Sequence, residues 1–229
     1  MPAAKPPAQI RDTLKSRGFF ITFEGIDGTG KTTQFLRLVR SLRRQGYAVC
    51  ATREPGGTRV GEQIRKILLA GSHGLAPLAE LALMYAARAQ HLEEVIRPAL
   101  ERGEVVVSDR FNDSSFAYQG HGRALGEATV RHLDRAICGA TQPDLTLVLE
   151  LDPRLALKRA LGRDRRANST GSRFEAAGLE FQQRVRAGYR ARARRDPRRV
   201  RLIRADRPLE EIEAEIRRVV EERLKRRRT

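Results

Sequence analysis

The chain has 229 residues, 40% hydrophobic and 32% charged, so it is long enough for one domain with its own core and needs no metal or disulfide to hold it together. Its two cysteines fit neither a zinc site nor a disulfide framework. No run reaches the roughly 18 to 20 apolar residues of a membrane span, and no signal peptide is recognisable. These features predict a cytoplasmic protein without a membrane partner. The net charge of +17 is concentrated in residues 154–229, with 25 Lys and Arg against 11 Asp and Glu, but Glu is mixed in and aromatics are scarce, so nucleic-acid binding is not the expected function.

Five apolar runs along the chain predict the strands of a parallel sheet. The first four lack clean polar alternation, which predicts burial on both faces of the sheet, and the fifth is shorter. They are Phe19–Glu24, Tyr47–Thr52, Glu104–Ser108, Leu145–Leu151 and Val200–Arg204.

Helical periodicity fills the intervals between these runs and follows the last one. The order of strand and helix predicts the α/β class: one domain, residues 18–225, with an about five-stranded parallel sheet flanked by helices. Residues 1–17 are expected to be a flexible leader and residues 226–229 a frayed basic tail. The predicted helices are 32–45, 61–69, 78–102, 127–138 and 209–224.

Residues 162–178 differ from the rest of the chain. They have little periodic apolar character, four arginines and three glycines. Such a composition predicts an exposed, mobile, Arg-rich lid.

A glycine-rich segment between the first predicted strand and helix matches the phosphate-loop pattern G-x-x-x-x-G-K-[ST] in the context that the pattern requires. Glycines let backbone N–H groups surround a phosphate, and the following helix directs its positive end at the same anion. Lys31 is expected to reach the β and γ phosphates of ATP, Thr32 to bind Mg²⁺, and Thr33 to make a further contact. The predicted ATP-binding loop is Gly25, Ile26, Asp27, Gly28, Thr29, Gly30, Lys31, Thr32 and Thr33.

Polar segments follow the second and third predicted strands and should meet the phosphate loop, because ligands of a doubly wound sheet gather at the carboxyl ends of its strands. Arg53 and Arg110 can each bind a phosphate with a planar, forked guanidinium. Asp109 can orient Arg110 or hold water bound to magnesium. A second anionic substrate is therefore expected beside the phosphate loop.

These motifs resemble the thymidylate kinase family from about Phe19 to Leu224. The family combines, in this order, the phosphate loop, a T-R-E-P-G-G segment (52–57), an A-A-R helix (86–88) and a D-R…S-x-x-A-Y-Q-G segment (109–120). The resemblance implies a P-loop kinase fold and transfer of a phosphoryl group from ATP to dTMP.

The resemblance also implies roles for particular residues. Asp27 would lie near the dTMP ribose and the metal, Arg110 would bind the dTMP phosphate, Arg88 would face the thymine edge, and Tyr118 would lie against the sugar. The expected dTMP-binding set is Asp27, Arg53, Pro55, Met84, Arg88, Arg110, Ser115, Tyr118 and Gln119.

Three positions depart from the family pattern. Met84 stands where members usually carry a Phe that stacks on thymine, and a thioether can also pack on a ring face. Ser115 stands where some members carry Asn, and Gly28 where some carry an arginine. In members without that arginine the lid supplies the positive charge.

The lid offers several arginines for that purpose. Arg165 is assigned a catalytic role, and Arg163 and Arg166 are assigned to ATP binding, with Arg173 as a further candidate. The catalytic set is thus Lys31, Asp109, Arg110 and Arg165, and the metal set is Asp27, Thr32 and Asp109, directly or through water.

The predicted reaction is in-line phosphorylation of dTMP to dTDP with ATP and Mg²⁺, a step in dTTP synthesis, and the family suggests a homodimer. Two alternatives stay open: a kinase for another pyrimidine nucleotide or a deoxynucleoside, and a nucleic-acid-binding ATPase gated by nucleotide. An acceptor panel separates the first, and DNA- or RNA-stimulated hydrolysis would identify the second.

Overall fold

The protein is described here from a computed structural model, which covers residues 17–70, 74–167 and 177–228. Its centre is a five-stranded, all-parallel sheet with the strand order β2-β3-β1-β4-β5. All five predicted strands are present within two residues of their expected ends. They are β1 (Phe19–Glu24), β2 (Val49–Arg53), β3 (Val105–Asp109), β4 (Leu145–Glu150) and β5 (Val200–Arg204).

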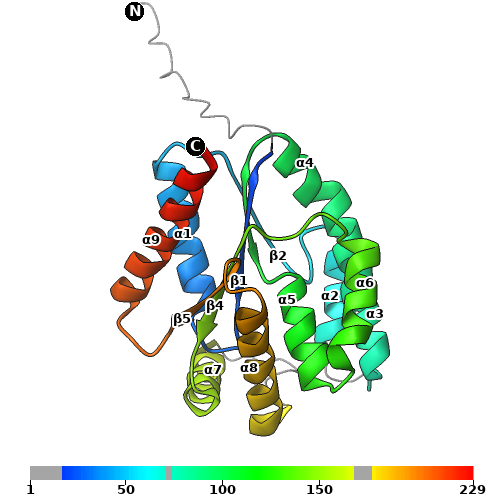
Figure 1. Cartoon of the computed structure of the whole chain (residues 1–229). Coiled ribbons are helices and arrows are strands. Elements are labelled where there is room, and N and C mark those ends of the chain that lie inside the picture. The colour runs from blue at the N-terminus through cyan, green and yellow to red at the C-terminus, as the bar shows by residue number, and fades with distance from the viewer. Residues whose placement is uncertain (1–16, 71–73, 168–176, 229) are drawn as a thin grey trace, which may run out of the picture.

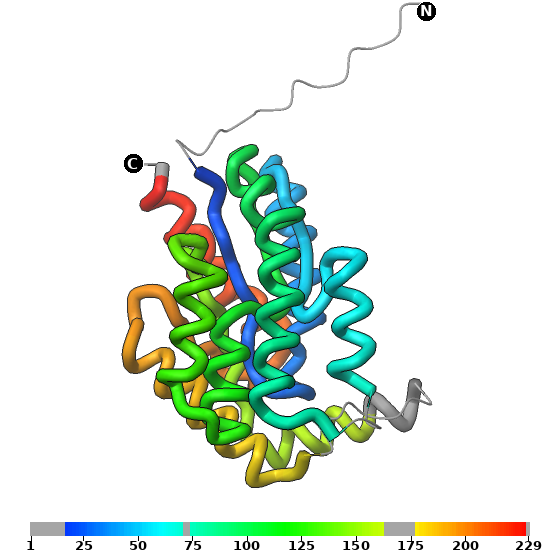
Figure 2. Tube along the Cα trace, turned by 90° about the vertical axis from the view of Figure 1, so that its right-hand side faces the viewer, coloured from blue at the N-terminus to red at the C-terminus, as the bar shows by residue number. Residues whose placement is uncertain are grey.

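Helices cover both faces of this sheet (Figure 1). One face carries α1 (Lys31–Arg44) and α9 (Leu209–Arg228). The opposite face, seen in Figure 2, carries α3 (Pro77–His91), α4 (Arg97–Glu101) and α6 (Gly126–Ile137), with α2 (Arg59–Leu69) packed against α3.

The side chains of β1 explain this layering, because successive residues of a strand point to opposite faces. Phe19, Ile21 and Phe23 are buried with residues of α1 and α9, whereas Phe20 is buried with residues of α3 and α4. The prediction of burial on both faces is confirmed for β1, β3 and β4. It is wrong for β2, which lies at one edge of the sheet and is only partly buried.

Two predicted helices are longer or less regular than expected. Residues 78–102 form one helical run interrupted by a π-helical turn, η1 (Leu92–Ile96), between α3 and α4. α9 continues through Arg227, whose guanidinium donates to Asp144 Oδ1 at 2.9 Å and lies 5.7 Å from the Phe19 ring centroid. The last turn of α9 is therefore anchored to the start of the sheet.

The remaining helices lie at the carboxyl ends of the strands, in the lower half of Figure 1. They are α5 (Asn112–Ser115), the π-helical η2 (Phe116–Gly122), α7 (Pro153–Ala167) and α8 (Gly178–Arg195). Residues 162–167 of the predicted lid thus continue α7, and residues 168–176 lie outside the described part of the chain.

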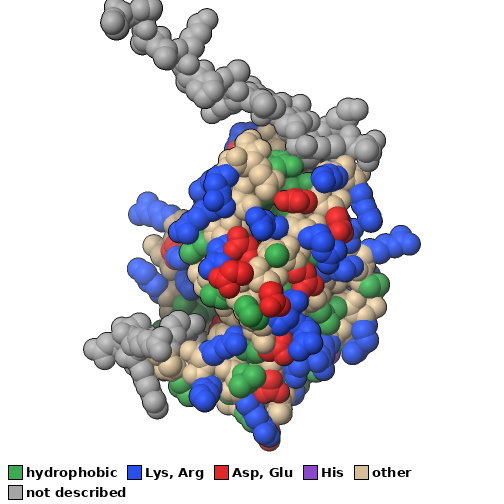
Figure 3. Space-filling view, turned by 90° about the vertical axis from the view of Figure 1, so that its left-hand side faces the viewer, with side chains coloured by type: hydrophobic (Ala, Val, Ile, Leu, Met, Phe, Trp, Pro, Cys, Tyr) green, Lys and Arg blue, Asp and Glu red, His purple; other side chains and the backbone are tan. Residues whose placement is uncertain are grey.

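The surface over α1 and α9 carries basic side chains with acidic ones between them (Figure 3). Arg37 donates to Glu213 at 2.7 Å, and Arg218 donates to Glu222 at 3.0 Å. Some of the basic side chains on this face are therefore paired with acidic neighbours. Of the helices described, none combines the length and apolar character needed to cross a membrane.

Candidate active site

The phosphate loop connects β1 to α1, and side chains of the loop bond back to the Ile26 carbonyl. Gly28 and Gly30 have φ values of +84° and +87°, a region that glycine enters without steric cost. The Ile26 carbonyl accepts hydrogen bonds from Thr29 Oγ1 and Lys31 Nζ, both at 2.9 Å. The Lys31 ammonium is therefore held inside the loop, at the amino-terminal end of α1.

Lys31 is buried beside two further charged groups. Its Nζ lies 3.6 Å from Asp27 Oδ1. Burial and the nearby Arg110 lower the pKa of Lys31 to about 8, against the opposing attraction of Asp27. At neutral pH the ammonium is still largely protonated and can neutralise phosphate charge.

Thr32 and Asp109 come together from different elements. Asp109 ends β3, and its Oδ2 accepts a hydrogen bond of 3.2 Å from Thr32 Oγ1 at the start of α1. Two of the three predicted metal ligands are thus adjacent at the mouth of the loop. Mg²⁺ characteristically binds one or two protein oxygens together with phosphates and water, so a hydroxyl and a carboxylate here fit that ion.

Arg110 is the most connected side chain of the site. Its Nη2 donates to Asp27 Oδ1 at 2.6 Å and to the Tyr118 hydroxyl at 3.2 Å, and its Nη1 donates to the Gly25 carbonyl at 2.9 Å. Its backbone has φ +74°, which costs a non-glycine residue on the order of 1 to 3 kcal/mol and is typical of functional positions. Asp27, not Asp109, is the carboxylate that orients this guanidinium.

A buried side chain, Glu24, holds two hydroxyl groups in place beside Arg110. Glu24 accepts hydrogen bonds from the Phe111 N–H at 2.8 Å, from Ser114 Oγ at 2.5 Å and from the Tyr189 hydroxyl at 2.9 Å. The same two hydroxyl groups also lie within 3.3 Å of Arg110 Nη1. Burial and the neighbouring Asp113 raise the pKa of Glu24 to about 7.

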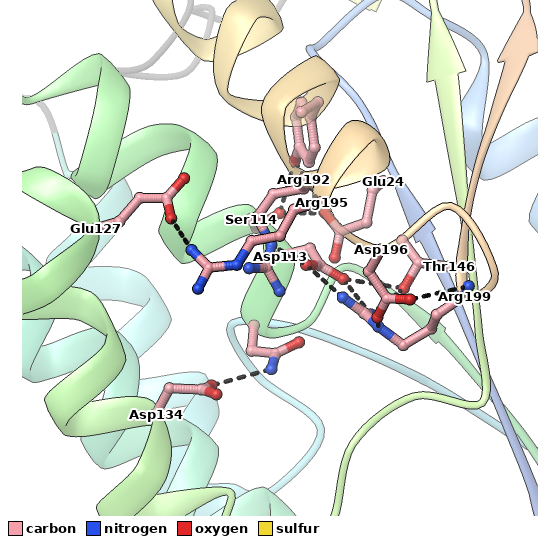
Figure 4. Close-up of polar contacts among 12 residues, drawn as sticks. Glu24, Asp113, Ser114, Glu127, Asp134, Thr146, Arg192, Arg195, Asp196 and Arg199 are labelled. Atoms are coloured by element: carbon pink, nitrogen blue, oxygen red, sulfur yellow. Dashed lines mark hydrogen bonds and ion pairs between the residues drawn. The ribbon is translucent and has the colours of Figure 1, made fainter.

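Asp113 of α5 ties this helix to the carboxyl-terminal part of the chain. Figure 4 shows it facing Arg192 of α8 and Arg199, which precedes β5. Arg199 donates to both carboxylate oxygens, at 2.6 and 3.0 Å, and Arg192 donates at 2.8 Å. Burial alone would raise the pKa of Asp113, but the two guanidinium groups outweigh it and hold that pKa well below its ordinary value.

A cavity of about 240 Å³ opens beside this network. Arg88 of α3 is fully buried at its wall: its Nε donates to Glu54 at 2.8 Å, its Nη1 to Ser115 Oγ at 3.0 Å and its Nη2 to the Phe111 carbonyl at 3.1 Å. The cavity also brings together most of the predicted acceptor-binding residues, namely Asp27, Pro55, Met84, Arg110, Tyr118 and Gln119.

A second cavity, of about 530 Å³, lies over the phosphate loop. Asp27 and Arg110 line both cavities, so they stand between them. Arg53 lines this second cavity but not the first. Its guanidinium is more than half exposed and donates to Glu62 at 3.0 Å. The loop residues that line it are Gly28, Gly30, Lys31, Thr32 and Thr33.

Sequence reasoning missed two arginines at these cavities. Arg65 of α2 lines both and donates to the Pro55 carbonyl at 2.8 Å, and Arg159 of α7 lines the cavity over the loop. A helix prediction for 61–69 alone cannot show which face meets the site. The predicted lid arginines are not placed: the side chains of Arg163, Arg165 and Arg166, and all of Arg173, lie outside the described part of the structure.

A parallel sheet whose first strand leads through this glycine-rich loop into a helix, with an Arg-lined acceptor cavity alongside, defines a P-loop nucleotide kinase. The profile of the family described as thymidylate kinase matches residues 23–216. The chain therefore belongs to the thymidylate kinase family.

Individual relatives agree over most of their length. A thymidylate kinase of Deinococcus radiodurans is 47% identical over 208 residues, 91% of this chain and 98% of the relative. One from Solidesulfovibrio magneticus is 50% identical over 187 residues, 80% and 90% of the two chains. The crystal structure of thymidylate kinase from Ehrlichia chaffeensis superposes with a TM-score of 0.72 at 32% identity, covering 89% of this chain and 98% of that one.

Proposed function

We propose that this protein phosphorylates dTMP to dTDP with ATP and Mg²⁺, and so contributes to dTTP synthesis. The observation that carries the proposal is the position of Arg110 and Asp27 between a cavity over the phosphate loop and a second cavity walled by Arg88. Two phosphate-bearing ligands can meet there end to end, as an in-line transfer between a donor and an acceptor requires.

On the donor side, the loop N–H groups and Lys31 would bind the β and γ phosphates of ATP. Thr32 and Asp109 would hold Mg²⁺, with Asp27 nearby, and the ion would neutralise charge on the bridged phosphates. The acceptor is already an anion, so no strong general base is needed. Positioning and charge neutralisation supply most of the catalysis.

On the acceptor side, Arg110 would bind the dTMP phosphate while Asp27 and Tyr118 hold its guanidinium in place. Arg88 would donate to the base. Three of its five N–H groups donate to protein atoms and hold the guanidinium in place, and since the side chain lines the cavity, the other two can reach a ligand. Met84, Ser115 and Gln119 would complete the base end, with Pro55 at the cavity wall.

Several arginines would contact the polyphosphate of ATP. The proposed set is Arg163, Arg165 and Arg166 of the lid. Arg53 and Arg159 are added because they line the cavity over the loop. Closure of a lid over this cavity would exclude water, which otherwise competes with dTMP as acceptor.

A homodimer is also proposed, through the face formed by α2 and α3. Leu78 is 56% exposed, Ala82 and Ala86 follow it on the same exposed side of α3, and Val60 and Ile67 of α2 are 44% and 42% exposed. Small and apolar residues at four-residue spacing allow close helix packing. Light scattering coupled to gel filtration would test it: Ala82→Glu should convert a dimer into a monomer.

The two free cysteines, one buried and one half-buried, support the predicted cytoplasmic location.

The activity is tested by a coupled assay of ADP formation with ATP, Mg²⁺ and dTMP, compared with dUMP, dCMP, thymidine and no acceptor. We expect turnover that depends on dTMP and falls by about 10³-fold or more in Arg110→Ala, as for other arginines that neutralise a transferring phosphoryl group. Arg194→Ala, an exposed arginine on α8, is the matched control.

Two results would overturn this assignment. Transfer to thymidine but not to dTMP would identify a nucleoside kinase. ATP hydrolysis that is indifferent to dTMP but stimulated by DNA or RNA would identify the nucleic-acid-dependent ATPase instead.

A further inference from the structure

A buried glutamate lies directly behind the base end of the acceptor cavity. Glu80, in the first turn of α3, has no exposed surface, and its Oε1 accepts a hydrogen bond of 2.8 Å from Gln119 Nε2. Gln119 is 1% exposed and lines the cavity. One side chain of the acceptor cavity is therefore held by a group that does not itself line it.

The charge of Glu80 is held by Arg123. Arg123 Nη2 lies 3.1 Å from Glu80 Oε2, and its Nε donates to Oε1 at 3.3 Å. The same guanidinium lies 4.7 Å from the centroid of the Phe181 ring of α8. Both Glu80 oxygens therefore lie within 3.3 Å of a guanidinium, which only donates, so this carboxylate accepts hydrogen bonds from its neighbours.

That restriction determines which way the Gln119 amide points. If the amide were turned around, its Oε1 would face a buried carboxylate oxygen, and two acceptors would oppose each other without a proton between them. The amide must direct Nε2 at Glu80. Within the described residues Gln119 Oε1 accepts no protein hydrogen bond, so it is available to a ligand.

We infer that Glu80 is a positioning residue that fixes Gln119 as a hydrogen-bond acceptor, and thereby selects pyrimidine bases that carry a hydrogen on N3. The inference rests on the proposed function. Arg88 and Gln119 both line the cavity, where Arg88 supplies donors and Gln119 an acceptor. Thymine and uracil present an acceptor at O4 and a donor at N3, which match both. Cytosine presents a donor at N4 and an acceptor at N3, which match neither.

The test measures selectivity and not activity alone. In Glu80→Gln the new amide can donate as well as accept, so Gln119 can turn over and present its NH₂ group. We expect the ratio of kcat/KM for dTMP to that for dCMP to fall about tenfold or more, mostly through a higher KM for dTMP, because a wrongly oriented buried amide leaves the base unpaired. Glu127→Gln removes a carboxylate that also pairs with arginines, but outside the cavity, and should keep the wild-type ratio.

A second variant identifies the route of the effect. Gln119→Leu should lower the ratio by itself, and adding Glu80→Gln to it should change the ratio no further, since the two residues act as one unit. A folded Glu80→Gln protein with the wild-type ratio would overturn the inference. If Glu80→Gln does not fold, a wild-type ratio in Gln119→Leu would overturn it equally.

Failure of the proposed function would look different. A wild-type protein that does not phosphorylate dTMP would refute the assignment as a dTMP kinase. Calorimetric titration of dTMP and dCMP without ATP would then still test the inference. We expect dTMP to bind more tightly to the wild type, with that preference reduced about tenfold in Glu80→Gln; equal binding of the two nucleotides by the wild type would overturn the inference.

Discussion

The two halves of the site are built in different ways. The phosphate loop consists of consecutive residues, and its shape comes from glycine backbone angles and from bonds between near neighbours such as Lys31 Nζ and the Ile26 carbonyl. The acceptor cavity is assembled from separate segments, and its central guanidinium, Arg110, bonds to residues up to 85 positions away. The donor half is local in its phosphate loop, although Thr32 also donates to Asp109 at the end of β3, whereas the acceptor half is long-range throughout.

This difference places most of the buried charge on the acceptor side, although Lys31 of the phosphate loop is buried too. Glu24, Glu54, Glu80, Arg88 and Asp113 are all buried around the acceptor cavity or beneath it. A buried charge is tolerated only when it is paired and hydrogen-bonded. The geometry of the acceptor side therefore depends on a framework of ion pairs. Changes in that framework should raise the KM for dTMP more than the KM for ATP.

The largest expected effect is on stability, from Asp113→Asn. Removing the charge leaves Arg192 and Arg199 without their buried partner, which should lower the free energy of unfolding by about 3 to 5 kcal/mol. Urea denaturation at pH 7 measures it. Asp196→Asn removes another partner of Arg199, but a partly exposed one, and should cost less than about 1 kcal/mol.

Kinetics of the same variant test the division between the halves. The KM for dTMP should rise more than the KM for ATP, because Asp113 joins α5 to α8 and so supports Ser114 and Tyr189 beside Arg110. Equal increases in the two KM values would contradict a division between a local donor half and a long-range acceptor half.

The next effect concerns pH. Glu24 has a pKa of about 7 in the folded chain and an ordinary value of 4.5, so between these values the folded state keeps a proton that the unfolded state has lost. Stability should therefore fall as pH rises from about 4.5 to 7, by about 3 kcal/mol for this group. Denaturation of wild type and Glu24→Gln across this range measures it. The variant should lose that much less stability, and parallel curves would show that Glu24 does not titrate as described.

The local character of the donor half explains why it could be predicted. All residues from Gly25 to Thr32 belong to one recognisable pattern, and β1 and α1 begin and end within one residue of expectation. Strand runs also predicted the parallel sheet, but not its order, because order depends on which strands pair. The partial exposure of β2 was missed for that reason, since its letters do not show that it lies at an edge.

The acceptor half could be predicted only where family motifs marked it. Arg88 and Arg110 were expected from their motifs, but the long-range contacts that hold the walls of the acceptor cavity were not: Glu80 meets Gln119 across 39 residues, and Asp113 meets Arg199 across 86. Arg65 and Arg159 were missed although they line a cavity. In a chain with 45 Lys and Arg, single arginines on amphipathic helices carry no mark of which face they occupy.

The smallest expected effect tests whether the shape of the phosphate loop depends only on the loop's own residues. Gly28 and Gly30 have nearly equal φ values, so alanine at either position carries a similar backbone cost of about 1 to 2 kcal/mol. They differ in what a methyl group would meet. At Gly28 it would lie 2.0 Å from the Ala156 carbonyl oxygen of α7, and at Gly30 no heavy atom of the described chain lies within 4 Å.

Gly28→Ala should therefore destabilise the protein by about 2 kcal/mol more than Gly30→Ala, because α7 has to move to admit the methyl group. Denaturation of both variants without nucleotide measures this difference. The expected result would make the position of α7, which leads into the lid, part of what shapes the loop, and would explain why a glycine occupies position 28. Equal losses would mean that the loop depends on its own backbone alone, and that the contrast with the acceptor half is complete.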